Sequence, residues 1–262
     1  MARPVIALLT DFGSRDHYAG TMKGVALGIC PDATLVDITH ELPAHDVLAG
    51  ALELAASYKY FPAGTVFLVV VDPGVGSTRR GIAADTGDYK FVAPDNGVLT
   101  VVLEEHPPKK IVELTERKYA RPSVSRTFEG RDRFAPAAAW LAKGIEVSAL
   151  GRSAGAVVTL DIPRAAADAD RITGQVLRVD RFGNLITNID RRIFEKLAGP
   201  LDIRVGTHVV QKVVSTYADA GPGDVCALFG STDHLEIAAN GDSAAARLDL
   251  GRGAPVHVAR RA

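Results

Sequence analysis

The stretch VVVDPGVGSTRR, residues 69–80, is where an apolar run ends abruptly in charge and glycine. Residues 66–71 are apolar throughout, Asp72 follows them directly, and a Pro/Gly turn leads to Arg79. A buried strand that ends at a carboxylate and enters such a turn is typical of the ligand-binding edge of an open α/β sheet. We therefore expect Asp72 and Arg79 to form a charged pair that holds a small polar reactant such as water. Taken alone, the segment is also compatible with a solvated aspartate and a surface arginine.

The composition is that of a globular protein with a sizeable core. The chain has 262 residues, 47% hydrophobic and 23% charged, with a formal net charge of -1. This length suits one large or two ordinary domains, and the charge balance argues against nucleic acid or an anionic membrane as a partner. The first apolar run, residues 5–9, is too short for a signal peptide or a membrane span. With two widely spaced cysteines, Cys30 and Cys226, this predicts a cytoplasmic protein with reduced thiols.

The first 165 residues alternate between short apolar runs and longer helical patterns. This alternation predicts an α/β domain, residues 1–165, with a mostly parallel sheet flanked by helices. Asp46 is the expected N-cap of its second helix. The expected strands are residues 5–9, 34–38, 65–71, 81–85, 90–93 and 110–114, and the expected helices are 16–30, 46–58, 94–105 and 134–143.

Helical patterns are scarce after residue 171. Residues 151–171 contain Pro163 and the run AAADAD, which suggests a domain boundary. Short segments rich in β-branched residues follow, separated by turn signals such as those at 221–223 and 240–241. We expect a smaller all-β, barrel-like domain over residues 172–262.

The histidines do not form a known metal-binding pattern. Asp37, His40, His45 and Asp46 lie close in sequence, but their spacing fits neither a helix face nor a familiar ligand loop. We therefore predict no metal site.

Three further polar segments lie in glycine-bearing turns: FEGRD at 128–132, DRFGN at 180–184 and STDHLEIAAN at 231–240. An asparagine beside an aromatic ring suits a nucleobase, since the amide both donates and accepts and the ring stacks. A strand-end aspartate suits ribose hydroxyls or an ammonium group. Each segment alone is also explained by ordinary turn chemistry, core packing and surface ion pairs.

The motifs taken together are more specific than any one segment. TDFG, VDPGVG followed by two arginines, APDNG, F-x-GRD-x-FAPAAA, D-x-FGN-x-x-TN and LEIAxN occur in this order over nearly the whole chain. The sequence resembles the S-adenosyl-L-methionine hydroxide adenosyltransferase family, the adenosine-forming S-adenosyl-L-methionine hydrolases, to which the fluorinating and chlorinating enzymes are related.

The resemblance implies a fold, an assembly and a reaction. The fold is an N-terminal α/β domain with a C-terminal β-barrel, and the assembly is a homotrimer whose subunits complete each other's sites. In the reaction, water or hydroxide attacks the ribose C5′ of S-adenosyl-L-methionine, which yields adenosine and L-methionine. No metal or organic cofactor is implied, because the sulfonium leaving group is already cationic.

The resemblance also implies three catalytic residues. Asp72 and Arg79 match two members of the family's water-handling trio, and Glu129 stands where the family usually has histidine. A glutamate can accept a proton and can pair with Arg79, whereas two neighbouring carboxylates repel each other. This departure is compatible with a tuned hydrolase, a slow one, or a different nucleophile.

The remaining matches imply substrate binding. Asp11 is expected to hold the ribose hydroxyls, and Asp180 the methionine ammonium. Asn184 is expected to read the adenine, with Phe182 beside it. The second-domain stretch expected to complete the neighbouring subunit's site contains Ser231 and Glu236.

Two other functions compete with hydrolysis. Transfer of a halide to the same carbon is opposed by the anionic side chains of Asp72 and Glu129. A non-catalytic binder of S-adenosyl-L-methionine or adenosine, in which Glu129 has abolished turnover, is the alternative from a different class.

Overall fold

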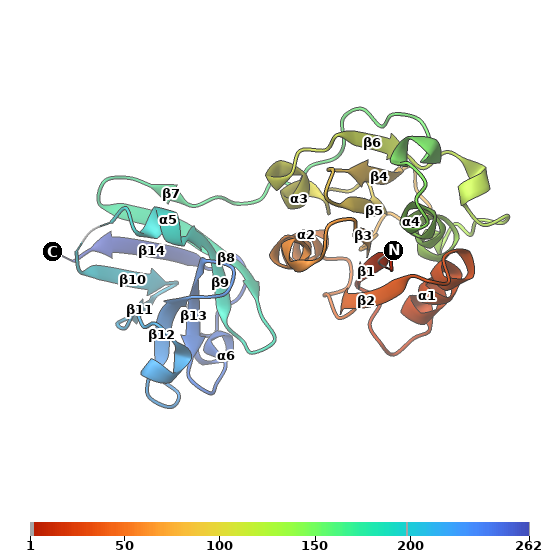
Figure 1. Ribbon diagram of the computed structural model, residues 1–262. Helices are drawn as coiled ribbons and strands as arrows, with labels where there is room; N and C mark the ends of the chain where they lie inside the picture. Colours follow the sequence, from red (N-terminus) through yellow and green to blue (C-terminus); the bar gives the residue numbers. More distant parts are fainter. Residues whose placement is uncertain (1–2, 198, 262) are drawn as a thin grey trace. The chain divides into compact units, whose positions relative to one another are not determined.

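The computed structural model describes residues 3–197 and 199–261. The chain forms two compact units, residues 1–160 and 161–262. Each is described by itself, and both appear in Figure 1.

The first unit is built on a mixed six-stranded sheet in the order β2-β1-β3-β5-β4-β6. β1, β2, β3 and β5 are mutually parallel where they pair, and β4 is antiparallel to both β5 and β6. This confirms the expected α/β class. The strands are β1 (Val5–Thr10), β2 (Thr34–Thr39), β3 (Val66–Val70), β4 (Gly81–Asp85), β5 (Lys90–Pro94) and β6 (Lys110–Glu113).

Helices cover both faces of this sheet because its central strands are apolar on both sides. In β1, Ile6 and Leu8 belong to the core under α1 and α4, whereas Ala7 and Leu9 belong to the core under α2 and α3. The helices are α1 (Tyr18–Ile29), α2 (Val47–Ser57), α3 (Thr100–Glu105) and α4 (Ala135–Ala142), and the shorter turns are η1 (Tyr58–Tyr60), η2 (Arg117–Tyr119), η3 (Gly130–Phe134) and η4 (Val147–Leu150).

Local sequence predicts the first residue of one helix correctly and that of another incorrectly. Asp46 is the N-cap of α2, as expected, and its side chain accepts a hydrogen bond from the Ala49 N–H. The expected start of α3 at residues 94–97 is wrong. Asn96 Oδ1 instead accepts from the Val98 N–H at 3.2 Å and Gly97 has φ +91°, so these residues form a turn before the helix.

The second unit is an antiparallel sheet in the order β11-β10-β14-β8-β9-β13-β12, with β7 paired to β8. The chain after β11 pairs with β12 through a bridge between Val213 and Ala227, which nearly closes the sheet into a barrel. Its elements are β7 (Ala166–Ala167), β8 (Arg171–Val179), β9 (Leu185–Asp190), α5 (Arg191–Phe194), β10 (Leu201–Val205), β11 (His208–Val210), η5 (Tyr217–Asp219), β12 (Val225–Phe229), β13 (His234–Ala239), α6 (Ala244–Leu248) and β14 (Pro255–Arg260).

Within the described ranges, none of the helices has the length and apolar character that a membrane crossing needs. Cys30 and Cys226 are both buried and unpaired with each other, one in each unit.

We predict that Leu68→Ala destabilises the first unit by about 2–5 kcal/mol, because Leu68 lies fully buried on the central strand β3. Trp140, the single tryptophan of the chain, lies in this unit, so its fluorescence reports urea unfolding there. Leu27→Ala is the matched control, since Leu27 is 40% exposed and its truncation costs less than about 0.5 kcal/mol. Equal shifts for the two variants would contradict this account of the core.

Candidate active site

The predicted pair of Asp72 and Arg79 forms, and Glu129 joins it. Arg79 Nε donates to Asp72 Oδ1 at 2.8 Å, and its Nη2 donates to both Asp72 Oδ2 and Glu129 Oε2. The three side chains are largely removed from water, with exposures of 10% for Arg79, 6% for Asp72 and 12% for Glu129. The structure therefore holds two carboxylates around one guanidinium at the end of β3.

Arg79 stays charged in this setting. Burial disfavours its charge, but hydrogen bonds and charge attraction from Asp72 and Glu129 outweigh burial and raise the pKa of Arg79. The guanidinium also stacks on the ring of Phe134, 5.1 Å from the ring centre. Its Nη1 is buried and donates to no group in the described part of the chain, so one donor remains for a further acceptor.

The turn between Asp72 and Arg79 depends on glycine. Gly76 has φ +76°, and a Cβ there would lie 2.4 Å from the backbone oxygen of Arg126. Ser77 fastens the turn, since its hydroxyl donates to Gly74 O at 2.6 Å and accepts from Arg79 N at 3.2 Å. The backbone thus returns Arg79 to Asp72 within seven residues.

Glu129 reaches the pair from a π-helical turn that sequence patterns did not predict. It directly precedes η3, the π-helical turn that leads into α4. Asp132 within this turn is fully buried and accepts from Ser125 N and from Arg131 Nε and Nη2. Burial would raise the pKa of Asp132, but these hydrogen bonds lower it. The one visible signal is a glycine beside a charge-rich segment, and π-turns of this kind recur at functional sites.

Asp11 lies at the same edge of the sheet. Thr10 pairs with Val70 in the parallel register, so Asp11 and Asp72 follow neighbouring strand ends. Asp11 Oδ2 accepts from the N–H of His45 at 2.8 Å. A ring contact of 6.0 Å between Phe12 and Phe128 links this loop to the segment that carries Glu129.

A side-chain network that runs from buried Thr10 to the surface fastens the loop of Asp11. Thr10 Oγ1 lies 2.8 Å from Nδ1 of His40, whose Nε2 lies 3.0 Å from Asp37 Oδ1. Lys23 binds the other oxygen of Asp37 at 2.6 Å. Burial alone would raise the pKa of Asp37, but the contacts from Lys23 and His40 lower it below its ordinary value. Asp37 and His40, whose spacing fits no metal-binding pattern, therefore support the loop after β1.

In the second unit, Asp180, Phe182 and Asn184 form one compact turn. Asp180 Oδ1 accepts from the N–H groups of Phe182 and Asn184 at 2.9 and 2.8 Å, and Oδ2 accepts from Asn184 Nδ2 at 2.9 Å. Asn184 is buried, whereas Phe182 is 76% exposed. The ring of Phe182 is thus open to solvent, and Asp180 shapes the turn.

Glu236 is a buried carboxyl in the same unit, 7% exposed, and it accepts from the hydroxyl of Tyr217 at 3.0 Å. Burial raises the pKa of Glu236, the charge of Asp180 adds to the rise, and the Tyr217 bond opposes it. Burial and Glu236 likewise raise the pKa of Tyr217 to about 12. Tyr217 was not among the predicted site residues, since only the fold brings it to Glu236. Ser231 is exposed.

The structure thus gathers the predicted residues into two sets. The first unit contains the ring of Asp72, Arg79 and Glu129 with Asp11 at the same sheet edge, and the second contains Asp180, Phe182, Asn184 and Glu236 with Tyr217.

Two family models match the chain: the SAM hydroxide adenosyltransferase N-terminal domain over residues 6–151, and the C-terminal domain over residues 174–257. The chain belongs to the SAM hydroxide adenosyltransferase family.

Similar proteins support this over the full length. A protein of Salinispora tropica named (R)-S-adenosyl-L-methionine hydrolase is 38% identical, with 97% of each chain covered. A fluorinase of Nocardia brasiliensis is 32% identical, with 98% of this chain and 97% of the other covered. The crystal structure of an uncharacterized conserved protein of Thermotoga maritima superposes with a TM-score of 0.93 at 37% identity, covering 97% of this chain and 100% of the other.

We predict that Glu236→Gln changes stability in a pH-dependent way. Because the pKa of Glu236 is higher in the folded state, that state binds more protons, and the wild type loses stability as the pH rises through the interval above the ordinary value of 4.5. Glutamine stays neutral, so the stability of the variant relative to wild type should increase as the pH rises above about 4.5. Urea unfolding followed by circular dichroism measures this.

The control for this prediction is Glu195→Gln, which removes an exposed carboxyl from the same unit. A pH-independent difference between Glu236→Gln and wild type would show that Glu236 does not titrate abnormally.

Proposed function

We propose that this chain hydrolyses S-adenosyl-L-methionine to adenosine and L-methionine. The observation that carries the proposal is the buried cluster of Asp72, Arg79 and Glu129, in a chain that aligns over its whole length with proteins named for this reaction. The cluster has the means to bind water and to accept its proton, and burial limits competition from bulk solvent.

In the proposed mechanism, one water molecule is held by the carboxylates and by the unused Nη1 donor of Arg79. Its oxygen attacks the ribose C5′ as the C5′–S bond breaks, and the bonding electron pair passes to sulfur. The sulfonium becomes the neutral thioether of methionine, so no acid and no cofactor is needed to expel it. The proton released by water goes to a carboxylate of the cluster. Catalysis then rests on positioning and desolvation.

Glu129 takes the place of the family's usual histidine in this scheme. Its Oε2 accepts from Arg79, and its Oε1 lies 3.7 Å from Arg133 Nη1. The two arginines balance the negative charge that Glu129 adds beside Asp72, which supports a carboxylate at this position.

Substrate binding is proposed to use both sets of residues. In the first unit, Asp11 would hold the ribose hydroxyls. In the second, Asp180 would take the ammonium and Asn184 would read the adenine beside Phe182, with Ser231 and Glu236 completing the pocket. A homotrimer, in which each second unit serves a neighbouring subunit, is part of the proposal because the family resemblance implies it.

Hydrolysis is favoured over halide transfer by charge. A halide would have to sit beside Asp72 and Glu129, and like charges in a buried site repel strongly. The higher identity to the proteins named hydrolase, 38% against 32% for the fluorinase, points the same way.

Product analysis tests the proposal directly. Purified protein is incubated with S-adenosyl-L-methionine, with and without chloride, and the nucleosides are separated by chromatography. Adenosine is expected in both cases, and Asp72→Asn should lower its rate by about 100-fold or more, since the carboxylate that positions the water is lost.

Asp88→Asn is the matched control for Asp72→Asn, because Asp88 lies exposed in the turn between β4 and β5, and it should match wild type. A chloride-dependent 5′-chloro product would replace the hydrolase by a halogenase, and binding without turnover would leave only the non-catalytic reading.

Glu129→His tests the departure from the family pattern. If glutamate substitutes for the usual base, histidine should keep or raise the hydrolysis rate, whereas Glu129→Ala should lower it by about tenfold to 1,000-fold. Steady-state kinetics of adenosine release measures both variants. An inactive Glu129→His protein that still folds would mean that this chain uses a different proton path.

A further inference from the structure

Arg80 has a role apart from its neighbour Arg79. Its Nε donates to Asp95 Oδ2 at 2.9 Å, and its Nη2 donates to the same oxygen and to Ala156 O, the latter at 2.7 Å. Its Nη1 donates to Ala154 O. Asp95 is buried, with 3% of its side chain exposed. The proposed reaction uses neither Arg80 nor Asp95.

The turn at residues 94–97 braces both ends of the catalytic turn, residues 71–80. Asn96 Nδ2 donates to Val71 O at 2.8 Å, directly before Asp72. At the other end, the side chain of Arg80 binds Asp95, and Asp95 N donates to Arg80 O at 2.9 Å. Both ends of the catalytic turn are therefore fixed by two adjacent side chains.

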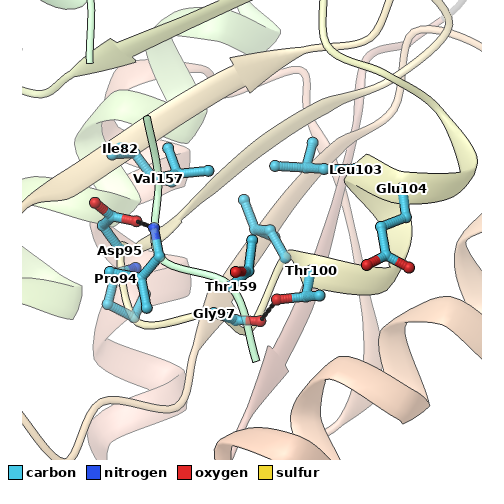
Figure 2. Close-up of a pocket in the computed structure, with 11 residues that line it drawn as sticks. Ile82, Pro94, Asp95, Gly97, Thr100, Leu103, Glu104, Val157 and Thr159 are labelled. Atoms are coloured by element: carbon cyan, nitrogen blue, oxygen red, sulfur yellow. Dashed lines mark hydrogen bonds between the residues drawn. The ribbon is translucent and has the colours of Figure 1, made fainter. Parts of the chain in front are cut away.

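The same turn and the first residue of α3 hold the segment 154–160, through which the chain leaves the first unit. Val158 N donates to Asp95 Oδ1 at 2.8 Å, a contact drawn in Figure 2, and Leu160 N donates to Thr100 Oγ1 at 2.9 Å. With the bonds from Arg80 to the carbonyls of Ala154 and Ala156, polar bonds attach this segment at alternate residues from 154 to 160.

A small cavity explains why these polar bonds matter. It has a volume of about 140 Å³ and lies between segment 154–160 and the start of α3, lined by Ile82, Leu103, Val157 and Thr159 among others (Figure 2). The pocket is partly open, and the apolar side chains that line it lack packing partners on that side, so the polar bonds carry more of the attachment there.

We propose that Arg80, Asp95 and Asn96 are positioning residues that couple the catalytic turn to segment 154–160. Release of the segment removes hydrogen bonds from Arg80 and Asp95, and this loosens the turn that aligns Asp72 with Arg79. The proposal rests on the proposed function only in taking turnover as one of its readouts.

Two matched pairs of variants test the coupling. Arg80→Met removes the brace, and its control is Arg152→Met, which deletes a 73% exposed arginine next to the segment. Val158→Pro removes the N–H that binds Asp95 and also fixes φ of residue 158, and its control is Val158→Ala, which keeps the N–H. Val158 is 50% exposed, so this second pair avoids a core change.

Arg80→Met and Val158→Pro are expected to lower kcat by about tenfold or more while KM for S-adenosyl-L-methionine stays within about twofold. Arg80→Lys should restore part of kcat, since it keeps a cation beside Asp95. Hydrogen exchange by mass spectrometry should quicken at residues 154–160 and also at 72–79, and the two controls should match wild type.

The coupling is overturned if Val158→Pro frees residues 154–160 while kcat and the exchange of 72–79 stay unchanged. It is equally overturned if Arg80→Met leaves hydrogen exchange unchanged both at residues 154–160 and at residues 72–79. A wild type that does not consume S-adenosyl-L-methionine refutes the proposed function alone, because the exchange at 72–79 still decides the coupling.

Discussion

The pairing of the Arg79 guanidinium with Asp72 and Glu129 is the interaction on which the polar edge of the first unit depends. A buried charge is tolerated when opposite charges pair with it, and removal of one partner leaves an uncompensated buried charge. The cluster therefore ties together three separate pieces of chain: the end of β3, the return of its turn, and the π-helical entry to α4.

Sequence patterns alone predicted those parts of this arrangement that depend on residues close together in the chain. An apolar run that ends in Asp72 predicted a buried strand and an edge site, and the spacing to Arg79 predicted their pair. The N-cap of α2 followed from Asp46 alone. The motif order supplied the family, and the position of Glu129 indicated its contact with Arg79.

Contacts between distant segments were beyond the reach of sequence patterns. The π-turn at η3 depends on a buried Asp132 that binds Ser125 and Arg131, and propensity does not register such a network. The delayed start of α3 depends on Asn96, whose side chain serves the turn and Val71 rather than a helix. Tyr217 acquires its partner Glu236 across 19 positions of chain. In the first two cases side-chain hydrogen bonds decide the backbone conformation, and in the third the fold alone brings the two partners together.

The loop between β3 and β4 places a limit on how this protein can vary. β3 and β4 are consecutive in the chain but are separated in the sheet by β5, so the loop that joins them must step across one strand, a span of about 9–10 Å. Residues 71–80 could extend over about 30 Å, well beyond this span, so the crossing itself does not fix the length of the loop. Its length is set by the turn that returns Arg79 to Asp72, and an insertion or deletion between these two residues would separate the pair even where the sheet still forms.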